Sequence, residues 1–285
     1  MYFYLGLLGS TISGLYSVLT KKTLAEVGVK QYQLIFSFIS LILSFPLYNL
    51  ILGLPFNFKA LYTTSFSVTL LMIFYFILRI VSNISHFTLL EDKESDVNVI
   101  TILVSMSSFV SIGLNFYIEK YFLPIVLLSL IVSVVGAILT TIDFKTMKFK
   151  LSKKSSIYIL LCLFAMGTKP IMANSLLKTF DAQTLCFFEY LNYFCMYLII
   201  YRKEIFKIKL NRKNLVNILI NTVLAMVVAY ISYIMFNSII LSIITSIFGT
   251  VSVAFFSVII LKTKLSKQNV IGIIFITLGI IIAKF

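Results

Sequence analysis

The stretch DFKTMKFKLSKK, Asp143–Lys154, lies at the middle of the chain and carries five lysines. The 285 residues are 60% hydrophobic and only 12% charged, so a long basic interruption stands out from its surroundings. The apolar segments before and after it follow similar patterns. The sequence therefore predicts two halves, residues 1–142 and 155–285, joined by a basic connecting loop at 143–154.

The segments on either side of this loop predict a membrane protein. The mean hydropathy is +1.05, and a bilayer core about 30 Å thick needs roughly 20 apolar residues per helical span. Apolar runs of that length follow one another with short polar breaks, so we expect an all-α polytopic protein with ten transmembrane helices. The weakest boundary is the uncharged break around Asn237–Ser242. The predicted spans are Tyr2–Thr20, Gln31–Leu52, Ser65–Leu89, Val97–Ile118, Phe122–Ile142, Ser156–Leu177, Ala182–Tyr201, Leu215–Ser238, Ile240–Leu261 and Gln268–Lys284.

The two halves echo each other. The first ends in YIEKYFLPIVLLSLIVSVVGAIL and the second in LKTKLSKQNVIGIIFITLGIIIA, with Gly136 and Gly279 at matching points. Near the start of each half, Gly14 and Gly167 also correspond. Each half has five spans, and an odd number makes the second copy enter the membrane upside down. The pattern predicts two inverted five-helix repeats, which in transporters place the substrate path between the repeats.

This pattern resembles the EamA-type, ten-helix branch of the drug/metabolite transporter superfamily. That branch has an apolar helix, a short turn with a glutamate, then a helix with two glycines seven apart. Gly272 and Gly279 match the glycine pair and Glu119 matches the first turn, whereas Thr263 replaces the glutamate of the second turn. The resemblance implies a secondary transporter with a central cavity and cytoplasmic termini. It implies no particular substrate, because the superfamily carries amino acids, nucleotide sugars, phosphates, choline-like cations and drugs.

The net charge of +14 follows the loops. Nearly all Lys and Arg lie in odd-numbered loops, and the other side has only Lys59, Lys120, Lys178 and Lys284. This placement is typical of membrane topology rather than of nucleic-acid binding, and no basic-aromatic binding module is present. The bias predicts that both termini face outward, opposite to the family resemblance, so only their location on one common side is firm.

Arg79, Asn83 and His86 form a polar stripe in the third span. Their spacing of i, i+4 and i+7 puts them on one helical face. A charged residue in a span costs about 2.5–3.5 kcal/mol, so Arg79 should face the interior. Two interpretations remain open: a cavity wall that meets a polar or anionic substrate, and a structural stripe bonded to neighbouring helices.

Lys169 and Glu189 are further charges within predicted spans. Lys169 precedes Pro170, whose missing N–H interrupts helical hydrogen bonding and suits a substrate path. Glu189 lies among aromatic residues, including Tyr193, and could meet an ammonium group or a coupling proton. The alternative is an internal ion pair of Glu189 with Lys169 or with Arg79.

The eighth span carries Met226, Tyr230, Tyr233 and Asn237 on one face. Tyr230 and Tyr233 could orient a ligand through their hydroxyls, although Tyr is also common in helix packing and at membrane interfaces. Gly6, Ser10 and Gly14 recur every four residues, as does Gly249 after Thr245, which predicts close helix packing.

The prediction is a secondary transporter of small polar or amphipathic metabolites, with amino acids or related zwitterions favoured by a mixed-sign cavity. The alternatives are a flippase for lipid or lipid-linked headgroups and, more remotely, a membrane-embedded enzyme, for which no sequence motif is present. We expect a multi-pass protein of the cell membrane, no cofactor or metal, and a coupling proton or ion; a homodimer stays open. The predicted substrate-binding residues are Arg79, Asn83, His86, Lys169, Glu189, Tyr193, Tyr230 and Tyr233.

Overall fold

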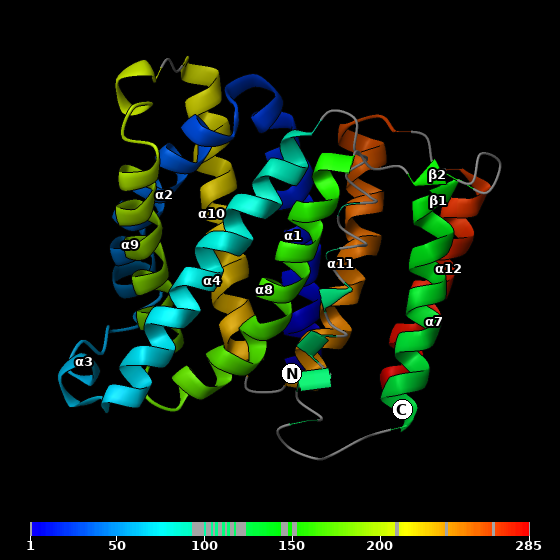
Figure 1. The fold of residues 1–285 in the computed structure, drawn as a ribbon, viewed down its shortest axis with the longest axis horizontal. Coiled ribbons are helices and arrows are strands. Elements are labelled where there is room, and N and C mark those ends of the chain that lie inside the picture. The colour runs from blue at the N-terminus through cyan, green and yellow to red at the C-terminus, as the bar shows by residue number, and fades with distance from the viewer. Residues whose placement is uncertain are drawn as a thin grey trace.

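The computed structural model describes residues 2–92, single positions between 100 and 117, and residues 124–143, 148–149, 153–208, 211–236, 239–263 and 266–284. Most of the predicted fourth span, Val97–Ile118, lies outside the described residues. Every other predicted span corresponds to one helix (Figure 1). The all-α polytopic fold expected from the sequence is confirmed.

The first half contains four long described helices. Helix α1 is followed by α2, whose end continues as the π-helical segment η1, and a short helix α3 precedes α4. The bounds are α1 Tyr2–Val27, α2 Val29–Phe45, η1 Pro46–Ile51, α3 Ala60–Thr63, α4 Phe66–Glu91 and α7 Pro124–Thr141.

The second half contains five long described helices. The 3-10 turn η2 lies between α9 and α10. Three residues separate the end of α10 from the start of α11, so the weakest predicted boundary does separate two helices. The bounds are α8 Lys153–Leu177, α9 Ala182–Ile200, η2 Ile205–Lys207, α10 Arg212–Met235, α11 Ile239–Ile260 and α12 Lys267–Lys284.

The basic joint is not purely a loop. Two short strands, β1 (Ile142–Asp143) and β2 (Lys148–Phe149), pair antiparallel within it. Backbone N–H and C=O groups just after the end of α7 have no helical partners, and pairing of the two strands gives them hydrogen-bond partners.

The turn between α1 and α2 is a single residue, Gly28, where the sequence suggests a longer basic loop. Its φ of 80° lies in the region that favours glycine. The backbone N–H of Val29 donates to Glu91 Oε1 at 2.9 Å, so a carboxylate satisfies one of the free donors at the start of α2. This contact fixes the end of α4 beside the α1–α2 turn.

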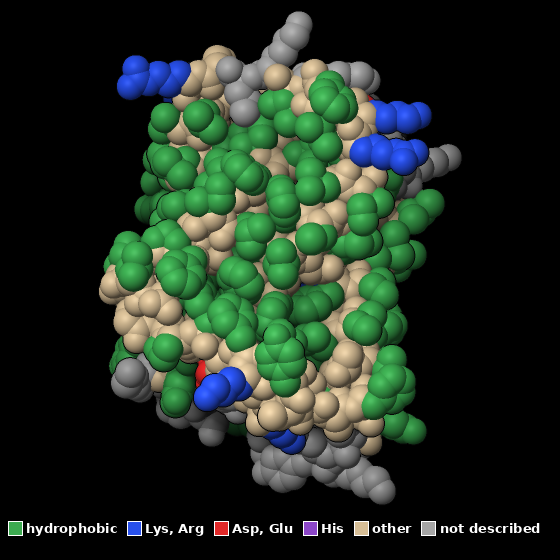
Figure 2. Space-filling view, turned by 90° about the vertical axis from the view of Figure 1, so that its left-hand side faces the viewer, with side chains coloured by type: hydrophobic (Ala, Val, Ile, Leu, Met, Phe, Trp, Pro, Cys, Tyr) green, Lys and Arg blue, Asp and Glu red, His purple; other side chains and the backbone are tan. Residues whose placement is uncertain are grey.

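Apolar side chains cover the outside of the bundle. Figure 2 shows hydrophobic side chains over the middle of one face, with Lys and Arg confined to its ends. Among the described residues, five helices are long and apolar enough to cross a membrane: Tyr2–Val27, Val29–Ile51, Phe66–Glu91, Ser155–Leu177 and Arg212–Met235. The chain is an integral membrane protein by fold and surface.

Helix contacts come in matched pairs across the two halves. Helix α2 packs on α9 and α7 on α12, which join equivalent helices, while α4 packs on α8 and α10 on α1. A Cβ at Gly14 would lie 2.8 Å from the backbone N of Val253 in α11, and one at Gly167 would lie 2.8 Å from the carbonyl oxygen of Ser107. The first helix of each half therefore contacts the fourth predicted span of the other half. Two halves with the same helix order, related by a two-fold rotation, would make such reciprocal contacts.

Candidate functional site

Arg79 of α4 and Glu189 of α9 form an ion pair between the two halves. Arg79 Nε donates to Glu189 Oε1 at 3.0 Å, and Nη2 donates to the same oxygen. Their side chains are only 12% and 2% exposed. Of the two ion pairs considered for Glu189 from the sequence, the one with Arg79 forms.

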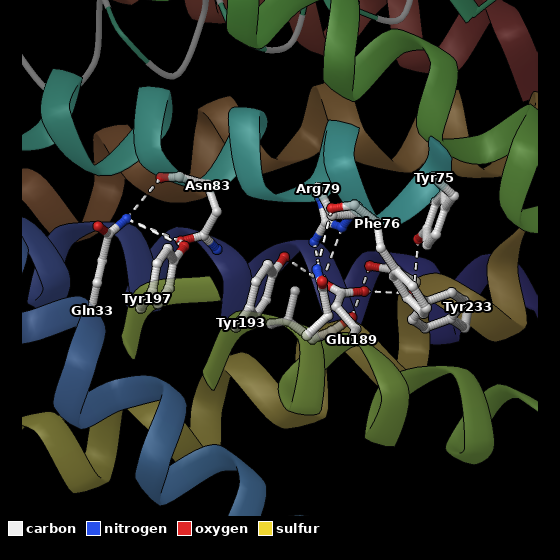
Figure 3. Close-up of polar contacts among 12 residues, drawn as sticks. Gln33, Tyr75, Phe76, Arg79, Asn83, Glu189, Tyr193, Tyr197 and Tyr233 are labelled. Atoms are coloured by element: carbon white, nitrogen blue, oxygen red, sulfur yellow. Dashed lines mark hydrogen bonds and ion pairs between the residues drawn. The ribbon is translucent and has the colours of Figure 1, made fainter. Parts of the chain in front are cut away.

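Tyrosine hydroxyls complete the surroundings of the Glu189 carboxylate (Figure 3). Tyr193 donates to Oε1 at 2.6 Å, and Tyr233 donates to Oε2. The hydroxyl of Tyr75 lies 2.8 Å from that of Tyr233. Because the single hydroxyl hydrogen of Tyr233 is used by Glu189, Tyr75 must be the donor in that contact.

A second polar cluster lies further along α9 and α4 (Figure 3). Asn83 Oδ1 accepts from the Tyr197 hydroxyl at 2.7 Å and from Gln33 Nε2 at 3.3 Å. The Tyr201 hydroxyl donates to Gln33 Oε1 at 2.8 Å. The rings of Tyr193, Tyr197 and Tyr201 stack in sequence along α9, with centroids 5.8 and 5.7 Å apart, so one aromatic column joins the two clusters.

A cavity of about 330 Å³ lies beside the ion pair. Its walls come from α1, α2, α4, α8, α9, α10 and α11 and from described positions of the fourth predicted span, whereas no described lining residue belongs to α7 or α12. Six of the predicted site residues line it: Arg79, Asn83, His86, Lys169, Glu189 and Tyr193. The polar stripe of the third span therefore faces a cavity in this structure, and His86 also stacks on Phe87 at 6.0 Å between ring centroids.

Lys169 approaches the cavity from α8, which stays helical through Pro170. Its ammonium lies 5.5 Å from the ring centroid of Tyr233 and 5.3 Å from that of Phe236. These distances are within the range of a cation–π attraction. Lys169 forms no salt bridge with Glu189 among the described residues, although both side chains line the same cavity.

Two predicted residues occupy other places. Tyr233 is fully buried and acts on Glu189 from behind the cavity wall. Tyr230 packs against Tyr48, with ring centroids 5.6 Å apart, and does not line the cavity. Both belong to an aromatic core between α2, α9 and α10.

Small residues of α1 and α11 do more than pack. Gly14 packs tightly against α11 as predicted, but Gly6, Ser10 and Gly249 line the cavity. The sequence favoured packing for these residues with cavity lining as the alternative, and their small side chains border the open volume. Of the three cysteines, Cys195 is exposed, whereas Cys162 and Cys186 are buried.

Sequence reasoning missed Tyr75, Gln33 and Tyr197. A signal existed for two of them: Tyr75 precedes Arg79 by four residues, and Tyr197 follows Glu189 by eight, so each shares a helical face with a charged residue. Within the described part of the chain, no group of three or more His, Cys, Asp or Glu side chains could hold a metal ion.

The fold and the site together define a polytopic helical membrane protein with a polar cavity between its two halves. Residues 153–285 match the EamA-like transporter family, and the resemblance seen in the sequence is confirmed over this range. The match covers the second half of the chain, which is therefore similar to a family of membrane transporters.

Structural similarity extends over nearly the whole chain. Among solved structures, 28 chains match. One crystal structure of another protein covers 96% of this chain and 96% of its own, with a TM-score of 0.70 and 11% sequence identity. At that identity the likeness establishes the fold alone. No curated protein matched the sequence.

Proposed function

We propose that the protein is a secondary transporter that carries small polar metabolites across the cell membrane by alternating access. The observation that carries the proposal is the cavity of about 330 Å³, which holds Arg79, Lys169 and Glu189 inside a bundle with an apolar exterior. That volume is near the lower end of ligand pockets, which span about 300–1,000 Å³, and suits a metabolite rather than a large amphiphile.

The origin of the cavity walls supports alternating access. Arg79 comes from the first half, whereas Lys169 and Glu189 come from the second. Rocking one inverted repeat against the other exposes a site at their interface first to one side and then to the other. We propose residues 1–142 and 155–285 as the two repeats and 143–154 as their connector.

The experiment uses purified protein in liposomes loaded with a defined mixture of small metabolites. We expect selected solutes to leave protein-containing liposomes faster than empty ones. Arg79→Met, Lys169→Met and Glu189→Gln should each reduce this release at least tenfold, because each removes a charge from the cavity wall. Lys178→Met is the matched control, because Lys178 is exposed and lies directly after the end of α8, the helix that carries Lys169. This variant should transport like the wild type.

Folding of each variant is checked before transport is compared. A thiol-reactive dye follows unfolding as the buried Cys162 and Cys186 become accessible. Release that matches empty liposomes for every solute would contradict the proposed function. Unchanged release by all three folded cavity variants would contradict the proposed site.

A further inference from the structure

Most of the acceptor capacity of the carboxylate in the cavity is used by the protein itself. Oε1 of Glu189 receives three donors, Arg79 Nε, Arg79 Nη2 and Tyr193, and Oε2 receives Tyr233, so about one lone-pair position on Oε2 stays open. An ammonium group of a substrate would find only that position, beside a guanidinium that already neutralises the carboxylate. Glu189 therefore serves to hold Arg79 and the tyrosines in place.

The ammonium of Lys169, in contrast, has hydrogen-bond donors that no described residue uses. It carries three N–H donors and lines the cavity, and among the described residues it forms neither a hydrogen bond nor an ion pair. The rings of Tyr233 and Phe236 stabilise its charge but accept no conventional hydrogen bond. Buried polar groups are nearly always hydrogen-bonded, so this ammonium is the group in the cavity that a ligand would satisfy.

Two further donor groups face the same cavity. Glu189 engages Nε and Nη2 of Arg79, which leaves the Nη1 amino group unused within the described part of the chain. The Oδ1 atom of Asn83 is occupied by Tyr197 and Gln33, so its amide NH₂ is the group that remains for a ligand. The charges of Arg79 and Glu189 cancel, and Lys169 leaves the cavity with a net positive charge.

We propose that the transported substrate is a small, water-soluble organic anion, whose carboxylate or phosphate group binds the ammonium of Lys169. Arg79 Nη1 and the Asn83 amide donate to the same anion or to neighbouring oxygens. The inference rests on the proposed function and narrows it: the substrate carries net negative charge, in place of the zwitterion that a mixed-sign cavity suggests. Hydrogen bonds to charged groups contribute about 1.5–3 kcal/mol each, so losing Lys169 should weaken binding at least tenfold.

The test loads liposomes with compounds matched in size and different in charge: butyrate, butyl phosphate, 4-aminobutyrate, butylammonium and butanamide. Mass spectrometry follows which of them leave through the wild-type protein, and empty liposomes correct for leakage. We expect release of butyrate, butyl phosphate or both, and comparison of these two assigns the anionic group. Lys169→Arg should retain this selectivity because it keeps the charge, Lys169→Met should lose it at least tenfold, and Lys178→Met should behave like the wild type.

The outcomes separate this inference from the proposed function. Preferential release of 4-aminobutyrate, butylammonium or butanamide would overturn the anion while leaving transport in place. Release of no compound by the wild type would contradict transport itself, together with the inference. A headgroup-labelled phosphatidylserine in the same vesicles should stay in its leaflet, and its protein-dependent reorientation would overturn a water-soluble substrate. The wild-type selectivity decides the charge class even where Lys169→Met does not fold.

Discussion

Arg79 and Glu189 stabilise the molecule only as a pair. Each alone would leave a charge in an apolar interior, and breaking a buried ion pair by removing one partner costs about 3–5 kcal/mol. The tyrosines around Glu189 add hydrogen bonds that offset the desolvation of the carboxylate. Arg79 and Glu189 are thus part of the architecture as well as of the cavity wall.

The pair predicts non-additive variants. Arg79→Met and Glu189→Gln should each lower the unfolding temperature markedly, because each leaves the other charge buried and unpaired. The double variant should lose less stability than the sum of the two single losses, since it leaves neither charge behind. The measurement is thermal unfolding in detergent, followed by dye reaction at the buried Cys162 and Cys186.

An exposed ion pair provides the comparison. Lys213 Nζ lies 3.1 Å from Glu26 Oε1, with side chains 67% and 36% exposed. Exposed pairs contribute about 0–1 kcal/mol, so Lys213→Met should barely change the unfolding temperature. Strict additivity of the Arg79 and Glu189 losses would refute the coupling.

At this scale the sequence points to residues but not to their partners. The sequence identifies Arg79, Lys169 and Glu189 because a charged side chain in an apolar span is energetically costly and is kept only where it is paired or functional. Gln33 carries no charge and costs little in a helix, so nothing in the sequence separates it from packing residues. The choice of Arg79 over Lys169 as the partner of Glu189 depends on how α4, α8 and α9 are rotated against one another, which no local pattern specifies.

Small residues let the backbones of α7 and α12 approach each other closely. A Cβ at Gly136 would lie 2.5 Å from the carbonyl oxygen of Gly272, and one at Gly279 would lie 2.7 Å from that of Ser129. Ser129 Oγ also donates to the Gly279 carbonyl at 2.6 Å. The pair stands at one edge of the bundle, away from α2 and α9 (Figure 1).

Gly136→Ala and Gly279→Ala should each destabilise the protein by about 1–3 kcal/mol, because the added methyl group meets backbone and forces the helices apart. Gly113→Ala is the matched control, since its Cβ would meet nothing within 4 Å. Thermal unfolding measures all three. Equal unfolding temperatures for the three variants would contradict tight packing between α7 and α12.

Helices were predictable here to within a few residues in most cases. The apolar runs identify α2, α8 and α9 well, but α1 continues to Val27, past the predicted end at Thr20. Lys21 and Lys22 end the apolar pattern without ending the helix, since backbone hydrogen bonding continues beyond the apolar region. The one-residue turn at Gly28 was not predicted, because its φ of 80° is set by how α1 and α2 pack rather than by the local sequence pattern.

For the whole molecule, both ends of the chain lie at the same end of the bundle (Figure 1). This agrees with an even number of spans, and the prediction that the termini share one side gains structural support. For the side itself, the charge distribution predicts the outside, whereas the family resemblance implies the cytoplasm.

Reporters fused before Met1 and after Phe285 should therefore give the same answer, and the charge bias predicts a location outside the cytoplasm for both. A reporter inserted within the basic joint should lie on the opposite side. Measurement uses a pair of enzymes, one active only in the cytoplasm and one active only outside it. Different locations for the two termini would contradict the fold, whereas cytoplasmic activity at both would overturn the charge-based orientation alone.

The pairing of helices across the halves also has a consequence for biosynthesis. Arg79 and Glu189 are 110 residues apart in sequence, and a ribosome adds about 5–20 residues per second. Arg79 is thus translated roughly 5–20 seconds before the carboxylate that neutralises it. During this interval the first helices have neither their counter-charge nor the partners of α2 and α7, so the nascent chain is most open to misassembly and quality control just before α9 is inserted.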